Sequence, residues 1–252
     1  MPKRTALKLV PFLAFLIALL AADSVSAQVF KISGRVTDQS TGQSISGVAI
    51  VGEGNQNGTR VAITDAQGNY TISFGANTNI RLRAYKTTYV FNPVLVGYSS
   101  VGGFPLAGSV TRDFGGSSFP ILIFALPPVL LTEDNSLNAL VLDDVINTRD
   151  PFPLTNDNYF GTDKRTRLTL LLVDLDVYPN RGETLSIITA QAQDAQLKTY
   201  TLVVEDLRKV PNFPWLSQLT VRLPPDLAGV TDVTLTVSAR GQVSNAAKMR
   251  LK

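Results

Sequence analysis

The chain has 252 residues, with 23 lysines and arginines against 20 aspartates and glutamates, 44% apolar residues, no histidine and no cysteine. This length allows one large domain, or two of ordinary size, with well-packed cores. Without imidazole or thiol, a Ser-His-Asp triad, a cysteine nucleophile, and zinc, haem or iron–sulfur sites of the usual ligand types are excluded. The composition therefore predicts a protein that is not an enzyme and that has no cofactor.

Residues 1–27 are typical of a secretory signal peptide. Lys3, Arg4 and Lys8 precede an uncharged run from Leu9 to Ala22, and Val25 to Ala27 supply the small residues of a cleavage site. The uncharged run is shorter than the roughly 20 residues of a membrane-spanning helix, and no later run approaches that length. We therefore expect an exported protein, extracellular, periplasmic or associated with the cell surface, with no transmembrane segment in the mature chain.

The charge of the mature chain argues against nucleic acid as a partner. The signal peptide accounts for three of the 23 cationic and one of the 20 anionic side chains, so its removal leaves a net charge of +1. A protein that binds nucleic acid through its phosphates normally carries a strong basic excess. An exported chain without cysteine also favours a bacterial source, since exported eukaryotic domains often carry disulfides.

Short alternating runs separated by turn residues fill the first half of the mature chain. They predict strands at 29–37, 48–51, 61–63, 70–74 and 80–85, with a turn from Asp65 to Gly68. A glycine- and serine-rich stretch from Val94 to Phe119 leads to the apolar run Ile121 to Leu126, which we interpret as the last strand of a first domain.

Pro127 and Pro128 mark the predicted domain boundary, because neither proline can donate to a sheet ladder. Beyond them, further strands are predicted at 140–142, 168–173, 185–190, 198–204, 219–223, 233–237 and 247–251. We expect Trp215 to plug the core or its edge. The chain is thus predicted to be all-β, with two tandem antiparallel β-sandwiches at 28–126 and 127–252, the second of them immunoglobulin-like.

The segments Ile32 to Asp38, Thr41 to Val48 and Thr64 to Ile72 follow the order G-x-V-x-D, TG, I-x-G-V and T-D-x-x-G-x-Y-x-I. In this, residues 29–91 resemble the carboxypeptidase regulatory-like domain, a transthyretin-like β-sandwich close to the B-type repeats of bacterial collagen adhesins. The resemblance implies a rigid, non-catalytic module that spaces or displays other domains. Thr88 departs from the family, which usually has glycine before the aromatic residue, so Thr88 must take a negative φ or accept strain.

The second half resembles an uncharacterised C-terminal domain of secreted proteins from soil bacteria. The residues that carry this resemblance are Thr148 to Pro153, Lys209 to Pro211, Leu223 to Gly229 and Ser244 to Ala247. The resemblance implies a location and an architecture and assigns no activity.

Acidic clusters are the candidates for metal binding or hydrolysis. Asp174 and Asp176 alternate at the end of a predicted strand and are the weak Ca²⁺ candidates, although no EF-hand pattern surrounds them and a solvated loop is the favoured interpretation. Paired carboxylates that hydrolyse glycosides normally lie in a deep cleft, which two small sandwiches rarely form. No Ser-x-x-Lys motif supports a Ser-Lys dyad.

Aromatic and basic residues are the candidates for ligand binding. Tyr85 shares strand parity with Arg81 and Arg83 and is predicted to be an exposed ring of a sugar-binding platform. Tyr89, Phe91 and Tyr98 are other platform candidates, although Tyr89 and Phe91 fit the sandwich core better. Basic residues that could meet an anionic envelope polymer, or simply be a wetted strand face, are Arg81, Arg83, Lys86, Lys164, Arg165 and Arg167.

Two hypotheses about function follow from these residues. The first is a non-enzymatic exported structural or adhesive protein that displays or spaces surfaces at the cell envelope, with another surface protein or an envelope glycan as partner. The alternative is a carbohydrate-binding module for cell-wall or extracellular glycan, in which Tyr85, Arg81 and Arg83 form the ligand site.

Overall fold

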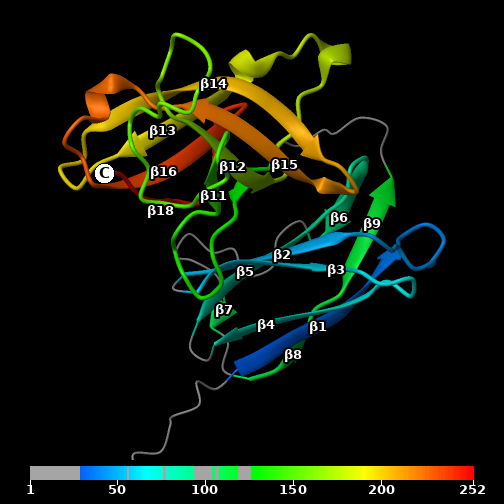
Figure 1. The fold of residues 1–252 in the computed structure, drawn as a ribbon. Coiled ribbons are helices and arrows are strands. Elements are labelled where there is room, and N and C mark those ends of the chain that lie inside the picture. Colours follow the sequence, from blue (N-terminus) through cyan, green and yellow to red (C-terminus); the bar gives the residue numbers. More distant parts are fainter. Residues whose placement is uncertain (1–28, 56, 76–77, 94–103, 106–107, 119–125) are drawn as a thin grey trace, which may run out of the picture.

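The computed structural model describes residues 29–55, 57–75, 78–93, 104–105, 108–118 and 126–252 (Figure 1). Within these ranges the chain forms β-strands and three short 3-10 helices, η1 (Pro179–Arg181), η2 (Leu185–Ile187) and η3 (Pro225–Leu227), and no α-helix. The prediction of an all-β protein is therefore confirmed. The predicted signal peptide, Tyr98 and all but the last residue of the predicted strand Ile121 to Leu126 lie outside the described residues. In the described part, no helix has the length and hydropathy to cross a membrane.

Strands β1 to β9 form the N-terminal sandwich, which has two sheets. The first has the order β4-β1-β9-β6 with β8 beside β1, and the second has the order β3-β2-β5-β7. The first contains β1 (Val29–Asp38), β4 (Asn69–Gly75), β6 (Tyr89–Asn92), β8 (Val110–Thr111) and β9 (Phe114–Ser118). The second contains β2 (Ala49–Gly54), β3 (Gly58–Ile63), β5 (Asn79–Tyr85) and β7 (Phe104–Pro105). Paired strands are antiparallel, except that β1 runs parallel to β8 and β9.

Alternation along the strands sorts side chains to the two faces of each sheet, as the sequence predicts. Ile50 of β2 and Leu82 of β5 point between the sheets, where they join Ile32, Phe74 and Phe114 in a buried cluster. Their neighbours in sequence consequently face the opposite side of the sheet. This parity determines which residues reach the second sandwich.

The loops of the N-terminal sandwich contain one confirmed prediction and one local departure. The amide of Gly68 donates to the carbonyl of Asp65 at 3.0 Å, which closes the predicted turn. Thr88 has a φ of 69°, in the left-handed region. It therefore keeps the glycine-like backbone at this position and accepts the strain that a β-branched residue experiences there.

Strands β10 to β18 form the C-terminal sandwich, in the order β10-β12-β15-β14-β13-β16-β17, with β11 paired to β12 and β18 paired to β16. The strands are β10 (Val129–Leu130), β11 (Val141–Asp143), β12 (Arg167–Val173), β13 (Ile188–Gln193), β14 (Thr199–Val210), β15 (Phe213–Arg222), β16 (Asp232–Ala239), β17 (Gln242–Val243) and β18 (Ala247–Arg250). Strand β14 pairs first with β13 and then with β15, with a register shift between Val204 and Asp206. It thereby turns the corner between the two layers.

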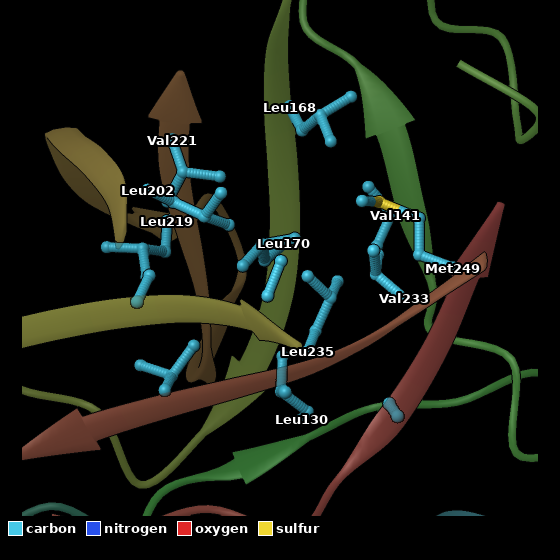
Figure 2. Packing of buried hydrophobic residues seen from close by; sticks show 14 of the residues in the cluster. Leu130, Val141, Leu168, Leu170, Leu202, Leu219, Val221, Val233, Leu235 and Met249 are labelled. Atoms are coloured by element: carbon cyan, nitrogen blue, oxygen red, sulfur yellow. The ribbon is translucent and has the colours of Figure 1, made fainter. Parts of the chain in front are cut away.

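The core of the C-terminal sandwich lies between these layers. Leu170 of β12, Leu219 of β15 and Leu235 of β16 are each 0% exposed and belong to one cluster (Figure 2). The segment predicted as a central strand, Leu168 to Val173, makes up β12 from its second residue onward, and it pairs with β15 along its whole length.

One predicted strand in this half begins later than expected. Residues 185–187 of the expected strand 185–190 form η2 instead, and β13 starts at Ile188. The hydroxyl of Thr184 accepts a bond from the amide of Ser186, which caps this turn. Capping by a threonine side chain competes with the extended conformation that the apolar pattern favours.

Candidate functional site

The two sandwiches meet at an apolar junction. Ala49 and Val51 of β2 lie on the outer face of the N-terminal sandwich but are 0% exposed, because they pack against Val129, Leu131 and Val173 of the C-terminal sandwich. Tyr85 belongs to the same cluster, and the partly buried residues around it are Val61, Leu140, Leu171, Trp215 and Leu216. Trp215 therefore packs at the edge between the sandwiches, where it also makes an edge-on contact with Phe213, with ring centroids 6.0 Å apart.

Tyr85 occupies the centre of the polar part of this junction. The strand parity that groups it with Arg81 and Arg83 is correct, but the prediction of an exposed ring is wrong, since Tyr85 is 6% exposed. The face predicted to be wet is covered by the C-terminal sandwich. A buried ring cannot serve as the flat platform on which a sugar stacks.

The hydroxyl of Tyr85 donates a hydrogen bond to the Oδ2 atom of Asp176. The ammonium of Lys209, on β14, lies 2.6 Å from Oδ1 of the same carboxylate and 5.6 Å from the centroid of the Tyr85 ring. Burial, reinforced by the negative charge of Asp176, raises the pKa of Tyr85 well above its ordinary value. The phenol therefore stays protonated and acts as a fixed donor.

Asp174 and Arg83 form a second polar pair across the junction. Nη1 of Arg83 lies 3.3 Å from Oδ2 of Asp174 and donates to the carbonyl of Pro127 at 2.6 Å. Burial raises the pKa of Asp174 to about 6, although the charge of Arg83 opposes this shift. The side chain of Arg83 is only 4% exposed. The partners of this buried guanidinium thus come from the other sandwich.

The Ca²⁺ candidates Asp174 and Asp176 are therefore used as ion-pair partners in this arrangement. Their carboxylates accept hydrogen bonds or ion pairs from Arg83, Tyr85 and Lys209. A bound Ca²⁺ would need the oxygen atoms that these donors already occupy. Among the described residues, no group of three or more carboxylate, histidine or cysteine side chains is close enough to hold a metal ion.

The β2–β3 hairpin provides further contacts between the sandwiches. The amide of Thr59 donates to the hydroxyl of Thr132 at 2.8 Å, and the amide of Thr132 donates to the hydroxyl of Thr59 at 2.7 Å. Arg60 lies 2.7 Å from Asp134. Gly58, with a φ of +70°, approaches so closely that an added Cβ would lie 2.0 Å from the carbonyl oxygen of Ser136.

The other predicted aromatic and basic residues lie apart from the junction. Phe91 belongs to the core of the N-terminal sandwich and Tyr89 stacks on it, with centroids 5.9 Å apart, as their core interpretation predicts. Lys86 donates to the carbonyl of Ser46. Arg81 lines a cavity beside the junction.

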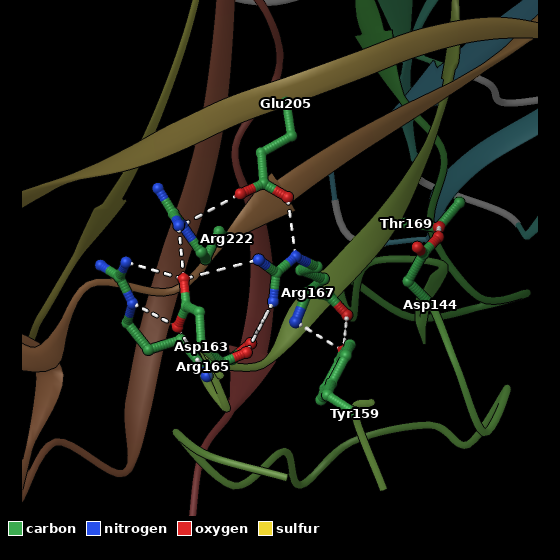
Figure 3. Close-up of polar contacts among 8 residues, drawn as sticks. All are labelled: Asp144, Tyr159, Asp163, Arg165, Arg167, Thr169, Glu205 and Arg222. Atoms are coloured by element: carbon green, nitrogen blue, oxygen red, sulfur yellow. Dashed lines mark hydrogen bonds and ion pairs between the residues drawn. The ribbon is translucent and has the colours of Figure 1, made fainter. Parts of the chain in front are cut away.

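Arg165 and Arg167 do not contribute to a basic stripe, because acidic residues neutralise them. Asp163 lies among Arg165, Arg167 and Arg222, and Glu205 forms ion pairs with Arg167 at 2.8 Å and with Arg222 at 3.0 Å (Figure 3). These arginines hold the pKa of Asp163 well below its usual range. The sixth basic candidate, Lys164, donates to the carbonyl of Asp157 at 3.2 Å.

Sequence reasoning identified four of the junction residues, Arg83, Tyr85, Asp174 and Asp176, but it missed Lys209 and the Thr59–Thr132 pair. One signal for the junction was present: Val48 to Val51 is apolar at every position, a pattern typical of a strand buried on both faces. Lys209 and the two threonines carried no comparable signal.

Comparisons with known proteins leave the family open. No family model matches the chain, and no curated protein matches it. The match to the major pilin subunit BcpA of Bacillus cereus covers 89% of this chain and 70% of the BcpA chain, at 8% identity and a TM-score of 0.27. The match to the major pilin SpaD of Corynebacterium diphtheriae covers 89% of this chain and 64% of the SpaD chain, at 7% identity and a TM-score of 0.28.

A DUF3823 family protein from Bacteroides ovatus covers 88% of this chain and 100% of its own length, at 10% identity and a TM-score of 0.24. Such TM-scores are too low to support a conclusion about this chain. The resemblance to the carboxypeptidase regulatory-like domain likewise stays a prediction.

Proposed function

We propose that the chain is a non-enzymatic exported structural protein, in which domains 28–126 and 127–252 form one rigid unit that spaces or displays surfaces at the cell envelope. The junction is the observation that carries this proposal. Interfaces between domains of one chain usually allow relative motion unless they are large and apolar. Here Ala49, Val51 and Val173 are all 0% exposed, and they restrict that motion.

The polar contacts of the junction fix its geometry. Arg83 reaches both Asp174 and Pro127, so a shift of one sandwich against the other would separate a buried guanidinium from these partners. Removal of one partner from a buried ion pair is strongly destabilising. The paired contacts of Thr59 and Thr132 lie elsewhere on the junction and oppose a hinge motion about the first pair.

The acidic residues of the junction support a role in structure over a role in catalysis. Asp176 contacts both Tyr85 and Lys209, and Asp174 contacts Arg83. A general acid and a general base require access to a substrate. No specific observation favours the carbohydrate-binding alternative, since Tyr85, the central residue of that hypothesis, is buried.

Residual dipolar couplings from amides of residues 28–252 test the rigidity. We expect a single alignment tensor to fit both sandwiches. In the variant Val51→Asp, a charge in the apolar junction should give two tensors, whereas Val203→Asp, at a residue 41% exposed, should keep one. Two independent tensors in the unmodified protein would contradict the proposed rigid unit.

Cell fractionation tests the location separately. Protease treatment of intact bacteria that express the full chain should degrade the mature protein at the envelope while cytoplasmic proteins survive. Recovery of an unprocessed chain only in the cytoplasm would contradict export and leave the rigidity result unaffected.

A further inference from the structure

A groove with a volume of about 440 Å³ runs beside strand β14 in the C-terminal sandwich. Four consecutive residues of this strand, Asp206 to Lys209, line one wall. Successive side chains of a strand point to opposite faces of its sheet, so four in a row that border one groove place it along the edge of the strand. The opposite wall belongs to the segment 175–185.

No described strand pairs with β14 on this edge. Strand β13 pairs with β14 only from Thr199 to Leu202, and β15 is its neighbour among the described strands from Asp206 to Lys209 (Figure 1). The line of β13 does not continue along the edge, because residues 185–187 form η2 instead of the predicted strand. The alternating N–H and C=O groups of such an edge are a template for another extended chain.

Contacts within the segment 175–185 fix the second wall of the groove. Glu183 accepts hydrogen bonds from Nε of Arg240 at 2.7 Å and from the amide of Tyr178 at 2.9 Å. A wall that is already ordered reduces the entropy lost when a ligand binds. Because the groove has this second wall, it suits a lone extended segment better than the edge of a complete sheet.

The groove combines apolar side chains with two opposite charges on its rim. Val177, Leu185 and Leu207 are partly buried against the core of the C-terminal sandwich. Arg208, whose side chain is 78% exposed, forms an ion pair with Asp206, two residues away on the same face of β14. An exposed ion pair of this kind contributes little to stability, so either partner can turn to a ligand at small cost.

We propose that this groove binds an extended segment of a partner protein, which adds to the edge of β14 as an antiparallel strand. This orientation continues the line of β13, which is itself antiparallel to β14. An acidic residue of the segment lies opposite Arg208, an apolar residue opposite Leu207 and a basic residue opposite Asp206.

This arrangement matches both components of the groove. Main-chain hydrogen bonds to the strand edge supply the affinity, and alternate side chains supply the specificity. Residues opposite each other in a ladder share a face, so the apolar residue joins Leu207 while the charged residues stay on the rim. The inference goes beyond the proposed rigid unit, since the junction between the sandwiches holds whether or not a partner occupies the groove.

Two synthetic peptides of the same composition test the register. The first is acetylated and amidated Thr-Val-Glu-Val-Lys-Val-Thr, and the second exchanges its Glu and Lys. Titration of residues 28–252 should shift the amide signals of Asp206 to Lys209, and the first peptide should bind several-fold more tightly. The second peptide opposes Lys to Arg208 and Glu to Asp206, and like charges opposite each other in a ladder are destabilising. Equal affinities, a preference for the second peptide, or no saturation at millimolar first peptide would overturn the proposal.

Methylation of the peptide backbone separates strand addition from simple apolar binding. Only alternate amides of an added strand face its neighbour. N-methylation of the central Val and, in another peptide, of the Glu before it should therefore abolish binding in one case and leave it nearly unchanged in the other. The same result for both methylated peptides would contradict strand addition.

A matched pair of variants locates the binding on β14. Arg208→Glu should weaken binding of the first peptide several-fold, since it opposes two carboxylates. Arg149→Glu, at an arginine that is 64% exposed and paired with Glu133 in another part of the sandwich, should leave binding unchanged. Equal effects of the two variants would contradict the assigned groove. Dimers of the unmodified protein in sedimentation velocity that Arg208→Glu dissociates would assign the edge to a second copy and overturn the proposal.

Discussion

Thr59 and Thr132, which are 73 positions apart in the chain, each donate a backbone amide to the hydroxyl of the other, at 2.8 and 2.7 Å. Thr59 is 5% and Thr132 4% exposed. The two side chains thus satisfy two buried amides, and among the described strands none of one sandwich pairs with a strand of the other. Each bond joins a backbone amide of one sandwich to a side-chain hydroxyl of the other, so rotation of either side chain would leave a buried donor unpaired.

Thr132→Val should therefore destabilise the protein although it preserves the shape of the side chain. It leaves the amide of Thr59 without an acceptor, at a cost of about 1–3 kcal/mol. Urea unfolding followed by tryptophan fluorescence measures this loss. Thr189→Val, at an exposed position of β13, is the matched control and should change stability by less than about 0.5 kcal/mol. Similar values for the two variants would argue against the exchange as a stabilising contact.

Gly58→Ala should weaken the junction for a different reason. Its φ is +70°, and its Cβ would lie 2.0 Å from the Ser136 carbonyl oxygen and 2.1 Å from the Thr132 hydroxyl. Gly42 has the same φ and nothing within 4 Å of such a Cβ, so Gly42→Ala measures the backbone cost alone, about 1 kcal/mol.

We expect Gly58→Ala to lose at least about 1 kcal/mol more than Gly42→Ala, since the nearest obstructing atom is a backbone carbonyl oxygen and the next is the buried Thr132 hydroxyl. Residual dipolar couplings should also show a changed orientation of the sandwiches in Gly58→Ala only. Equal losses of stability and equal couplings in the two variants would contradict the close approach.

The sequence predicted the fold well because alternation and turn chemistry are local. The period of two along β5 placed Leu82 inward and Tyr85 outward, and both assignments are correct. The turn from Asp65 to Gly68 depends only on its own residues. Strand ends were less accurate where a side chain competed for the backbone, as Thr184 does before β13.

The candidate site was predicted only in part, because a side chain on the outer face of a sheet is not necessarily exposed to solvent. A strand pattern tells two faces apart, but it does not reveal that a second domain covers one of them. For this reason the ring of Tyr85 was predicted to be exposed to solvent. The partners of Asp174 and Asp176 could not be predicted, because these partners lie on strands distant in the sequence. Contacts between residues as distant as Tyr85 and Lys209 depend on how the two sandwiches dock.

Thr88→Gly should stabilise the protein. The φ of 69° strains a β-branched residue by about 1–3 kcal/mol, and glycine removes this strain at an entropic cost of about 0.5–1 kcal/mol. We expect a net gain of about 1 kcal/mol in the free energy of unfolding. Ala66→Gly, at an exposed turn residue without a positive φ, should have the opposite sign. A loss of stability in Thr88→Gly would show that its side chain contributes more than its backbone costs.

Asp174 makes the junction sensitive to pH. The charged groups around it are Arg83 on β5, Asp176 in the same loop, Lys209 on β14 and Arg240 after β16. Burial raises its pKa from 3.8 to about 6, so the folded protein holds a proton there that the unfolded chain releases above pH 4. The stabilisation from this proton is fully present below pH 4 and is lost as the pH rises through 6.

The variant Asp174→Asn isolates this contribution, and its φ of 59° is a conformation that asparagine tolerates well. The stability of the unmodified protein relative to Asp174→Asn should decrease by about 2–3 kcal/mol between pH 4 and pH 7, because ionisation of the buried carboxyl costs the folded state alone. Urea unfolding of both proteins at intervals across this pH range gives the difference between their free energies of unfolding. The contributions of the other carboxylates are common to both proteins and cancel in this difference. A difference that is constant with pH would mean that Asp174 is ionised throughout, and its ion pair with Arg83 would then outweigh its burial.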